Sequence, residues 1–313
     1  MRAGASALIR VLTCALLLSA CAGGDPPSPP PTGEVRTPEP TRAPSGEAST
    51  APAEPTTPTR NPLADLVEGV ELDDDPVLGA DISWPQCPKG LGIPEKPTQG
   101  SPLPVAEARF VIVGLTNGPG FYPNPCLADQ VSYVRSRGLM LGAYAVASFP
   151  EAARVARHGT EGPYDGSTRL GALANTGFQQ ARFNVASMKR AEFLTPAVWI
   201  DVEPVPSFEW SGDLEANAAV VAGVARGYEE AGYRIGIYST PFLWEGVVGD
   251  LELGVPEWRA AGQTSASEAL DRCGDDWVIQ GGQALIGQWV QDNRDMNLTC
   301  PGFTDLAAWF HQY

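Results

Sequence analysis

The chain has 313 residues and a formal net charge of −16 at pH 7, with 37 acidic residues against 21 basic ones. This balance excludes a basic surface that could neutralise nucleic-acid phosphates, so no nucleic-acid partner is expected, and it does not favour direct binding to anionic lipids. A solvated acidic surface explains the charge most simply.

The first twenty residues have the pattern of a targeting segment. Arg2 and Arg10 flank small residues, and the apolar run over 11–18 is too short to span a bilayer as a permanent helix. Leu18-Ser19-Ala20-Cys21 resembles the bacterial lipobox, in which the cysteine becomes the lipidated N-terminus. We predict a lipoprotein signal peptide over 1–20 and an extracytoplasmic protein, lipid-anchored to the bacterial cell membrane through Cys21. An ordinary secretory signal with a chance cysteine is the alternative. Removal of the signal would change the net charge from −16 to about −18, because both arginines are lost.

Residues 21–76 are predicted to form a lipid-anchored, disordered linker. Up to about Pro62 they are mainly Pro, Thr, Ser, Ala, Gly and Glu, with almost nothing apolar to bury. Such a segment cannot offset its conformational entropy by folding. The linker would hold the folded part, residues 77–313, away from the membrane surface.

Residues 77–313 suit one α/β domain. Apolar runs typical of buried parallel strands lie at 79–84, 110–115, 139–146, 197–203 and 233–239. Helical spacing occurs over 127–137, 177–193 and from Ser211 or Asp213 to 231, and a polar excursion over 148–170. Beyond 239 helices are scarce, and strand-like pieces follow at 258–261, 277–279 and 285–290. Five βα units followed by bare strands predict an irregular parallel barrel.

The stretch 197–204 ends in two carboxylates and a proline. Side chains alternate along a strand, so Asp201 and Glu203 should share one face while Val202 points the other way. Pro204 lacks an N–H, so the strand should stop there and leave both acids at its C-terminal end. That end carries the chemistry in parallel barrels. Cα atoms about 6.5–7 Å apart allow the carboxylate separations used in glycoside hydrolysis.

Four cysteines remain if Cys14 is removed with the signal and Cys21 is lipidated: Cys87, Cys126, Cys273 and Cys300. An even number outside the cytoplasm predicts two disulfides. Three pairings are possible and sequence alone does not choose, although neighbouring loops favour Cys87–Cys126 and Cys273–Cys300. With no Cys-x-x-Cys and only His158 and His311 as imidazoles, no metal site is predicted.

Five short motifs follow one another along the domain: Asp81-Ile82-Ser83 with Gln86, Asp201-Val202-Glu203, Gly236-Ile237-Tyr238-Ser239 with Trp244, Gln288-Trp289, and Asp295-Met296-Asn297. Their order resembles that of the lysozymes (N-acetylmuramidases) of glycoside hydrolase family 25. This resemblance covers nearly all of residues 79–300. It implies an α/β fold, an irregular TIM-like (β/α)5(β)3 barrel. It also implies that Glu203 is the acid/base residue and Asp201 its partner, with Asp81 and Asp295 as flanking acids.

Four carboxylates crowded at one barrel mouth would repel one another and raise the pKa of at least one. The raised group keeps the proton that it donates to the leaving oxygen, while the others stay ionised and stabilise positive charge at the anomeric carbon. We expect Glu203 to be the donor and Asp201 to be ionised. Asn297 is expected to contact substrate, and three aromatic residues could stack on sugar rings, although a core position is the alternative for each: Tyr144, Tyr238 and Trp289.

The sequence therefore predicts a surface-anchored glycoside hydrolase that cleaves peptidoglycan or a related cell-wall glycan. No cofactor is called for, since two carboxylates suffice for the chemistry. The expected partners are the wall glycan and, through the lipid anchor, the membrane; the domain is expected to be a monomer. A non-catalytic wall-glycan-binding lipoprotein on the same barrel is the main alternative, and a structural or adhesive surface protein is a weaker one.

Overall fold

The computed structural model describes residues 75–313. The predicted signal peptide over 1–20, the lipidation at Cys21 and nearly all of the predicted linker over 21–76 lie outside the described residues. None of the helices in residues 75–313 is both long and apolar enough to cross a membrane.

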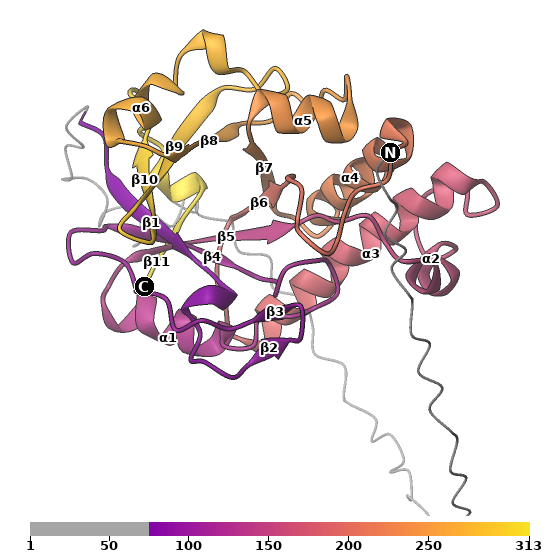
Figure 1. Cartoon of the computed structure of the whole chain (residues 1–313), viewed down its shortest axis with the longest axis horizontal. Helices are drawn as coiled ribbons and strands as arrows, with labels where there is room; N and C mark the ends of the chain where they lie inside the picture. The colour runs from indigo at the N-terminus through magenta and orange to yellow at the C-terminus, as the bar shows by residue number, and fades with distance from the viewer. Residues whose placement is uncertain (1–74) are drawn as a thin grey trace, which may run out of the picture. The chain divides into compact units, whose positions relative to one another are not determined.

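Eight strands close into a barrel, drawn from indigo to yellow in Figure 1. The first seven run parallel to their neighbours, and the last, β10, pairs antiparallel with both β9 and β1 and so closes the ring. In chain order the strands are β1 (Leu78–Ile82), β4 (Phe110–Gly114), β5 (Met140–Val146), β6 (Ala197–Asp201), β7 (Arg234–Ser239), β8 (Glu257–Gln263), β9 (Ala284–Gln291) and β10 (Arg294–Thr299). A short strand outside the ring, β11 (His311–Gln312), pairs with the start of β5.

Helices follow five of these strands. They are α1 (Leu127–Ser136) after β4, α2 (Ala152–His158) and α3 (Arg169–Arg190) after β5, α4 (Leu214–Glu229) after β6, α5 (Pro241–Val248) after β7 and α6 (Ala266–Asp271) after β8. Three strands, β1, β9 and β10, are not followed by an α-helix. The predicted irregular TIM-like (β/α)5(β)3 barrel is therefore confirmed.

The position of one helix-free strand differs from the prediction, because β1 is itself followed by an irregular connection. The connection holds the 3-10 turn η1 (Trp84–Gln86) and a small hairpin of β2 (Gly92–Ile93) and β3 (Lys96–Pro97). Prolines and glycines are frequent between residues 85 and 104. Both residue types disfavour a helix interior, which explains the hairpin in place of a helix.

Two other local predictions need correction. The expected strand over 277–279 is instead the 3-10 turn η2 (Asp275–Trp277) and a loop. The backbone N–H of Ile279 donates to the carboxylate of Glu257 and is not part of a sheet ladder. In addition, α3 begins eight residues before the expected position 177, since Thr168 caps it by accepting a hydrogen bond from the N–H of Gly171.

Aromatic side chains fill the end of the barrel opposite the four acids. Trp199 on β6 stacks on Trp309 with ring centroids 4.5 Å apart, and Phe110 packs on Phe310 at 4.7 Å. Trp309 follows the 3-10 turn η3 (Leu306–Ala308), so the C-terminal segment closes this end of the barrel. The interior below the acidic residues is consequently apolar and tightly packed.

The helical layer packs on the outer face of the sheet, where Val198, Ile200 and Val202 project from the β6 segment. Helices α3 and α4 lie against each other beside β6 (Figure 1). Their backbones approach so closely that a Cβ atom at Gly223 would lie 1.9 Å from the carbonyl oxygen of Ala174. This packing fixes β6, and with it the acids at its end.

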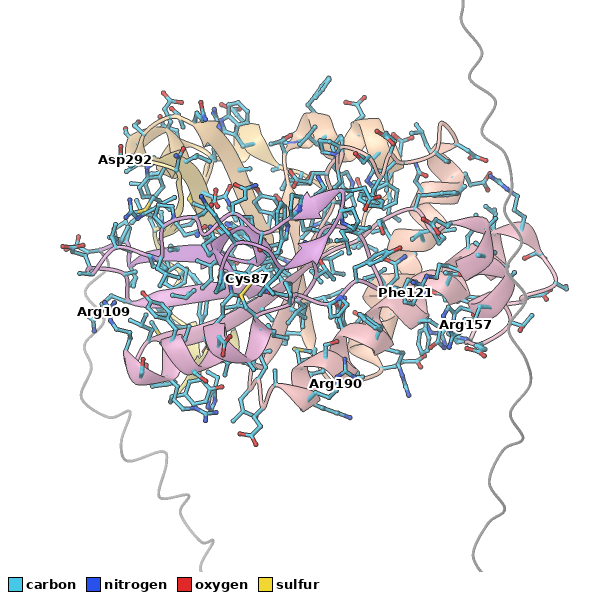
Figure 2. All side chains as sticks on the ribbon, turned by 60° about the horizontal axis from the view of Figure 1, so that its bottom comes forward. Cys87, Arg109, Phe121, Arg157, Arg190 and Asp292 are labelled. Carbon is cyan, nitrogen blue, oxygen red and sulfur yellow. A yellow bond between two sulfur atoms is a disulfide. The ribbon has the colours of Figure 1, made fainter. Side chains whose placement is uncertain are left out.

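Both disulfides have the favoured pairing, Cys87–Cys126 and Cys273–Cys300, each with Cα atoms 5.7 Å apart. The first joins the connection after β1 to the start of α1 (Cys87 is labelled in Figure 2). The second joins the loop after α6 to the residue that follows β10. The predicted disulfide framework is confirmed.

Candidate active site

The four predicted acids meet in one pocket at the barrel mouth. Its volume is about 130 Å³, and its lining consists of Asp81, Tyr144, Asp201, Glu203, Tyr238, Trp258, Gln288 and Asp295. Asp81 lies near the C-terminal end of β1, Asp201 ends β6, and Asp295 lies at the start of β10. Because β10 runs antiparallel to its neighbours, its N-terminal end reaches the same rim as the C-terminal ends of the others.

Strand alternation explains why Asp201 and Glu203 share this pocket. The strand β6 ends at Asp201, two residues earlier than predicted, but its geometry continues for one more residue. The N–H of Val202 donates to the carbonyl of Tyr238 at 3.0 Å, and its carbonyl accepts the Ser239 hydroxyl at 2.7 Å. The side chain of Val202 is buried outside the barrel, so Glu203 returns to the face of Asp201.

Asp81 is oriented by two amide side chains. Its Oδ1 accepts hydrogen bonds from Gln288 Nε2 at 3.0 Å and from Asn297 Nδ2 at 2.8 Å. Each amide is oriented in turn: the Oδ1 of Asn297 accepts the indole N–H of Trp258, and the Oε1 of Gln288 accepts the hydroxyl of Tyr238. An indole N–H can only donate, so the amide nitrogen of Asn297 is directed at Asp81.

Asp201 is the least satisfied carboxylate of the set. It is 3% exposed, and its Oδ1 is buried without a hydrogen-bond partner in residues 75–313. Burial, followed by the charges of Glu203 and Asp81, raises the pKa of Asp201 well above its ordinary value. An ionised carboxylate is strongly disfavoured here because nothing compensates its charge.

The other three acids also have raised pKa values. Burial raises the pKa of Asp81 well above its ordinary value, and Asp295 adds to this effect, although the two amide hydrogen bonds oppose it. Burial and then Asp295 raise the pKa of Glu203, while the positive charge of Lys96 lowers it. Burial raises the pKa of Asp295. The pocket therefore retains protons at a pH at which isolated carboxyl groups are ionised.

We expected an ionised Asp201 beside a protonated Glu203, and burial raises the pKa of both groups in the free protein. The raised pKa of Asp201 disfavours the ionised state that we expected for it. Glu203 is partly exposed at the opening. It is thus the acid that can contact a molecule entering the pocket and exchange protons with solvent.

Of the four predicted substrate-binding residues, two line the pocket and two do not. Tyr144 and Tyr238 line it as expected. Trp289 faces away from the pocket and is buried against Ala269 and Met296, so the prediction that it stacks on a sugar ring is wrong. The physical reason is alternation, since Gln288 faces the interior and its neighbour must face outward. Asn297 is fully buried and bonded to Asp81, so it orients the acid and does not contact a ligand directly.

Three residues of the site were not predicted. Trp258 lines the pocket, with its ring centroid 4.5 Å from that of Tyr238, and Gln288 lines it beside Asp81. Alternation along β8 and β9 places each on one of two faces of its strand but does not tell which face turns inward. Lys96 is different, because it acts on Glu203 from the β2–β3 hairpin. Asn117 docks this hairpin by accepting the N–H of Ile93 and donating to the carbonyl of Lys96, and no local signal indicates that contact.

No three His, Cys, Asp or Glu side chains within residues 75–313 are grouped so that they could hold a metal ion. The pocket offers acids, two tyrosines, a tryptophan and an amide. Chemically, this set can transfer a proton and can stabilise a nearby positive charge.

Part of the chain matches known lysozymes in sequence. Residues 169–268, which include Asp201 and Glu203, match the family model described as Lys-1, lysozyme-like protein 1. The probable GH family 25 lysozyme 4 of Dictyostelium discoideum is 37% identical over 65 residues, which make up 20% of this chain and 29% of that protein. The chain thus matches less than a third of the length of this curated relative. The resemblance to the lysozymes of glycoside hydrolase family 25 is confirmed.

Solved structures of lower sequence similarity include a family GH25 lysozyme from Aspergillus fumigatus, with 18% identity, a TM-score of 0.44, and coverage of 74% of this chain and 97% of that chain. The bacterial lysozyme from Streptomyces coelicolor has 15% identity and a TM-score of 0.44, with coverage of 75% and 97%. A family 25 glycosyl hydrolase from Bacillus anthracis has 13% identity and a TM-score of 0.46, with coverage of 73% and 90%.

Proposed function

We propose that this domain is a lysozyme-like glycoside hydrolase that cleaves peptidoglycan or a related cell-wall glycan by carboxylate acid/base chemistry. One observation carries the proposal: four carboxylates converge in a single pocket, and none of them forms an ion pair within residues 75–313. Uncompensated buried carboxylates are unfavourable for stability and are typical of sites that need protons at defined positions. The resemblance to family 25 lysozymes supports the same chemistry.

In the proposed reaction Glu203 donates its proton to the glycosidic oxygen as the bond to the anomeric carbon breaks. Positive charge develops at that carbon, and the neighbouring carboxylates stabilise it. Water supplies the hydroxyl group of the new reducing end, and its proton restores Glu203. Asp81 is held by its two amide partners in a fixed orientation, which costs no reorganisation during the reaction.

The decisive experiment replaces Glu203 with Gln and measures reducing ends released from purified cell walls. Glutamine keeps the shape of the side chain but has no proton to donate, so the rate should fall about 10²–10⁴-fold. The matched control is Glu215→Gln, which neutralises an exposed glutamate at the start of α4. This control should keep the full rate.

Two outcomes would contradict the proposal. Equal activity of Glu203→Gln and the parent chain would exclude Glu203 as the acid. Wall binding without any release of reducing ends by the parent chain would favour the non-catalytic wall-glycan-binding alternative.

We also propose that the protein is anchored at the bacterial cell surface by a lipid on Cys21, with the linker between anchor and domain. The lipobox-like sequence over 18–21 supports this location. Replacement of Cys21 with Ser should move the processed protein from the membrane fraction to the medium. Cys14→Ser, a cysteine change inside the predicted signal peptide, should leave it on the membrane. Retention of processed Cys21→Ser protein on the membrane would contradict the anchor.

A further inference from the structure

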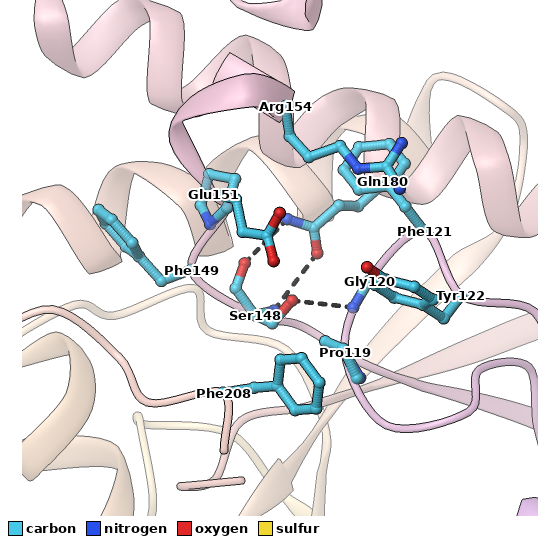
Figure 3. A pocket seen from close by; sticks show the side chains of 11 residues that line it. Pro119, Gly120, Phe121, Tyr122, Ser148, Phe149, Glu151, Arg154, Gln180 and Phe208 are labelled. Atoms are coloured by element: carbon cyan, nitrogen blue, oxygen red, sulfur yellow. Dashed lines mark hydrogen bonds between the residues drawn. The ribbon is translucent and has the colours of Figure 1, made fainter. Parts of the chain in front are cut away.

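Two further cavities lie on loops and helices next to the barrel mouth. The aromatic cavity, shown in Figure 3, is formed by the loops after β4, β5 and β6; its lining includes Phe121, Tyr122, Phe149, Arg154 and Phe208. The loop after β6 contributes Glu203 to the acidic pocket and Phe208 to this cavity. The second, which we call the arginine cavity, has a volume of about 420 Å³ and is lined by Phe121, Arg154, Arg157, His158, Gln179, Arg182 and Phe183. Phe121 and Arg154 line both cavities.

The arginine cavity is positive in an otherwise acidic domain. Residues 75–313 contain 16 Lys and Arg against 27 Asp and Glu, a net charge of 16 − 27 = −11. The lining of the arginine cavity nevertheless contains three arginines and no carboxylate. Arg154, Arg157 and Arg182 form no ion pair with any residue of the described chain, whereas Arg169, Arg226, Arg259 and Arg272 each do. The nearby Glu161 is engaged by His158, at 3.1 Å.

One of the three arginines, Arg154, is pre-organised by aromatic contacts. The guanidinium of Arg154 lies 5.0 Å above the ring of Phe121 and 5.8 Å from that of Tyr122, and the ring of His158 stacks on Phe121 at 5.1 Å. Phe121 itself has a φ of 67°, a left-handed conformation that is strained for a bulky residue. Ser148 stabilises this turn, because its hydroxyl accepts the N–H of Gly120 at 2.8 Å. Gln180 in turn accepts the N–H of Ser148 and donates to its carbonyl (Figure 3).

We propose that the arginine cavity is a binding site for carboxylate or phosphate groups of an anionic wall polymer, and that it holds such a polymer beside the acidic pocket. Guanidinium groups bind both anions through paired hydrogen bonds, and stacking on aromatic rings reduces the entropy lost on binding. A net charge of −11 would repel a polyanion elsewhere on the domain. Only the choice of a wall polymer draws on the proposed function, since anion binding itself requires no turnover.

The experiment compares two triple variants of the full-length chain that lose the same charge. The test variant is Arg154→Gln/Arg157→Gln/Arg182→Gln. The control is Arg109→Gln/Arg190→Gln/Arg234→Gln, three exposed arginines that do not line this cavity. Figure 2 shows Arg109 and Arg157 at opposite sides of the view. Calorimetric titrations use two probes, a glycerol phosphate oligomer for phosphodiesters and soluble uncrosslinked peptidoglycan strands for peptide carboxylates. Every chain titrated, the parent included, also carries Glu203→Gln so that the peptidoglycan probe is not cleaved. Melting temperatures confirm that both variants fold.

The test variant should bind at least one probe about tenfold more weakly than the parent chain, as expected for the loss of three exposed ion pairs, and the control should bind as the parent does. The probe that loses affinity identifies phosphate or carboxylate as the ligand group. Equal losses of affinity in both variants would show that only net charge matters and would contradict the proposed site. Unchanged binding in the test variant, or no binding of either probe by the parent chain, would also contradict it. Because binding and not hydrolysis is measured, an inactive Glu203 pocket would refute the proposed function without touching this result.

Discussion

Two buried acids of the barrel, Glu257 on β8 and Asp201 on β6, differ in whether their charge has hydrogen-bond and ion-pair partners. Glu257, on the outer face of β8, is fully buried and accepts a hydrogen bond at 2.7 Å from Arg259 Nε. It also accepts the backbone N–H groups of Ile279, Gln280 and Gly282 at 2.8–3.0 Å. Arg259 in turn donates to the carbonyls of Arg272 and Gly274. This pair holds the loop over 272–282 against the barrel.

Asp201, on the inner face of β6, is equally inaccessible but has no cation partner and one oxygen without any hydrogen bond in the described chain. A buried charge needs a partner to be tolerated, and its loss then destabilises the fold. A buried acid without one must instead hold a proton. The two acids are thus both buried and differ in compensation: Glu257 has a cation and backbone N–H partners, and Asp201 has no cation partner.

Replacement of Glu257 should cause the largest loss of stability. Glu257→Gln leaves Arg259 buried without an opposite charge and removes acceptor capacity for three backbone N–H groups. We expect the free energy of unfolding to fall by about 3–5 kcal/mol. Urea denaturation checks this, with the exposed Glu229→Gln on α4 as control. A loss as small as that of the control would show that the pair does not hold the loop.

The two disulfides allow the two regions to be tested separately, because one lies at the loop bound by Glu257 and the other at the connection next to the acidic pocket. Cys273–Cys300 closes the loop that Glu257 and Arg259 bind, and Cys87–Cys126 anchors the connection that carries Lys96. Replacing either pair with serines should cost about 2–4 kcal/mol of unfolding free energy.

Only the loss of Cys87–Cys126 should also reduce wall cleavage, since it loosens the hairpin that faces Glu203. Thermal denaturation and the reducing-end assay, run on both variants, test this difference. Equal activity losses in the two variants would indicate that the bridges are not specific to the two regions.

Asp201→Asn should have the opposite sign to Glu257→Gln. Burial raises the pKa of Asp201, so at pH 7 the parent must take up a proton on folding or bury a charge, whereas asparagine does neither. The free energy of unfolding at pH 7 should therefore rise by about 1 kcal/mol while wall cleavage falls. Chemical denaturation gives the sign directly. A destabilised Asp201→Asn would mean that Asp201 is a structural acid like Glu257.

The stability difference between Asp201→Asn and the parent should also depend on pH. The pKa of Asp201 is raised on folding, so between its unfolded and folded values the native state binds more protons than the unfolded state. Stability of the parent therefore falls as the pH rises toward the folded pKa, and the penalty disappears below the unfolded value of 3.8. Melting temperatures of the two proteins should converge as the pH is lowered. A difference that widens at low pH would contradict the raised pKa.

The smallest effect is expected from Lys96→Met. The positive charge of Lys96 lowers the pKa of Glu203, so its removal should raise that pKa. A general acid is active only while protonated, and the alkaline limb of the pH–rate profile should move to higher pH. The matched control is Lys89→Met, an exposed lysine in the same connection. A limb that stays in place or moves to lower pH would exclude this role for Lys96.

The sequence by itself determined the α/β class, the barrel strands except β10, and the shared face of Asp201 and Glu203, whereas the convergence of all four acids was implied by the family resemblance. These features depend on short-range patterns: buried apolar runs, alternation along a strand, and carboxylates at the strand ends. The sequence alone left three disulfide pairings open, although neighbouring loops favoured the observed pairing of Cys87 with Cys126. Asp213, one of the two residues from which this helix was expected to start, caps α4 by accepting the N–H of Ala216. Each of these features depends on residues that are close in the sequence or on elements that follow one another along the chain.

Only the tertiary structure decided which face of each late strand turns inward. Period-two alternation fits both faces equally well, so it does not tell whether Gln288 or Trp289 faces the barrel interior. The pairing of β9 with β8 and β10 decides this. In the same way, nothing near Glu257 in the sequence reveals the N–H groups of Ile279 and Gln280 that satisfy it, and nothing near Lys96 reveals Glu203. These contacts join residues more than twenty positions apart, and closure of the barrel creates them.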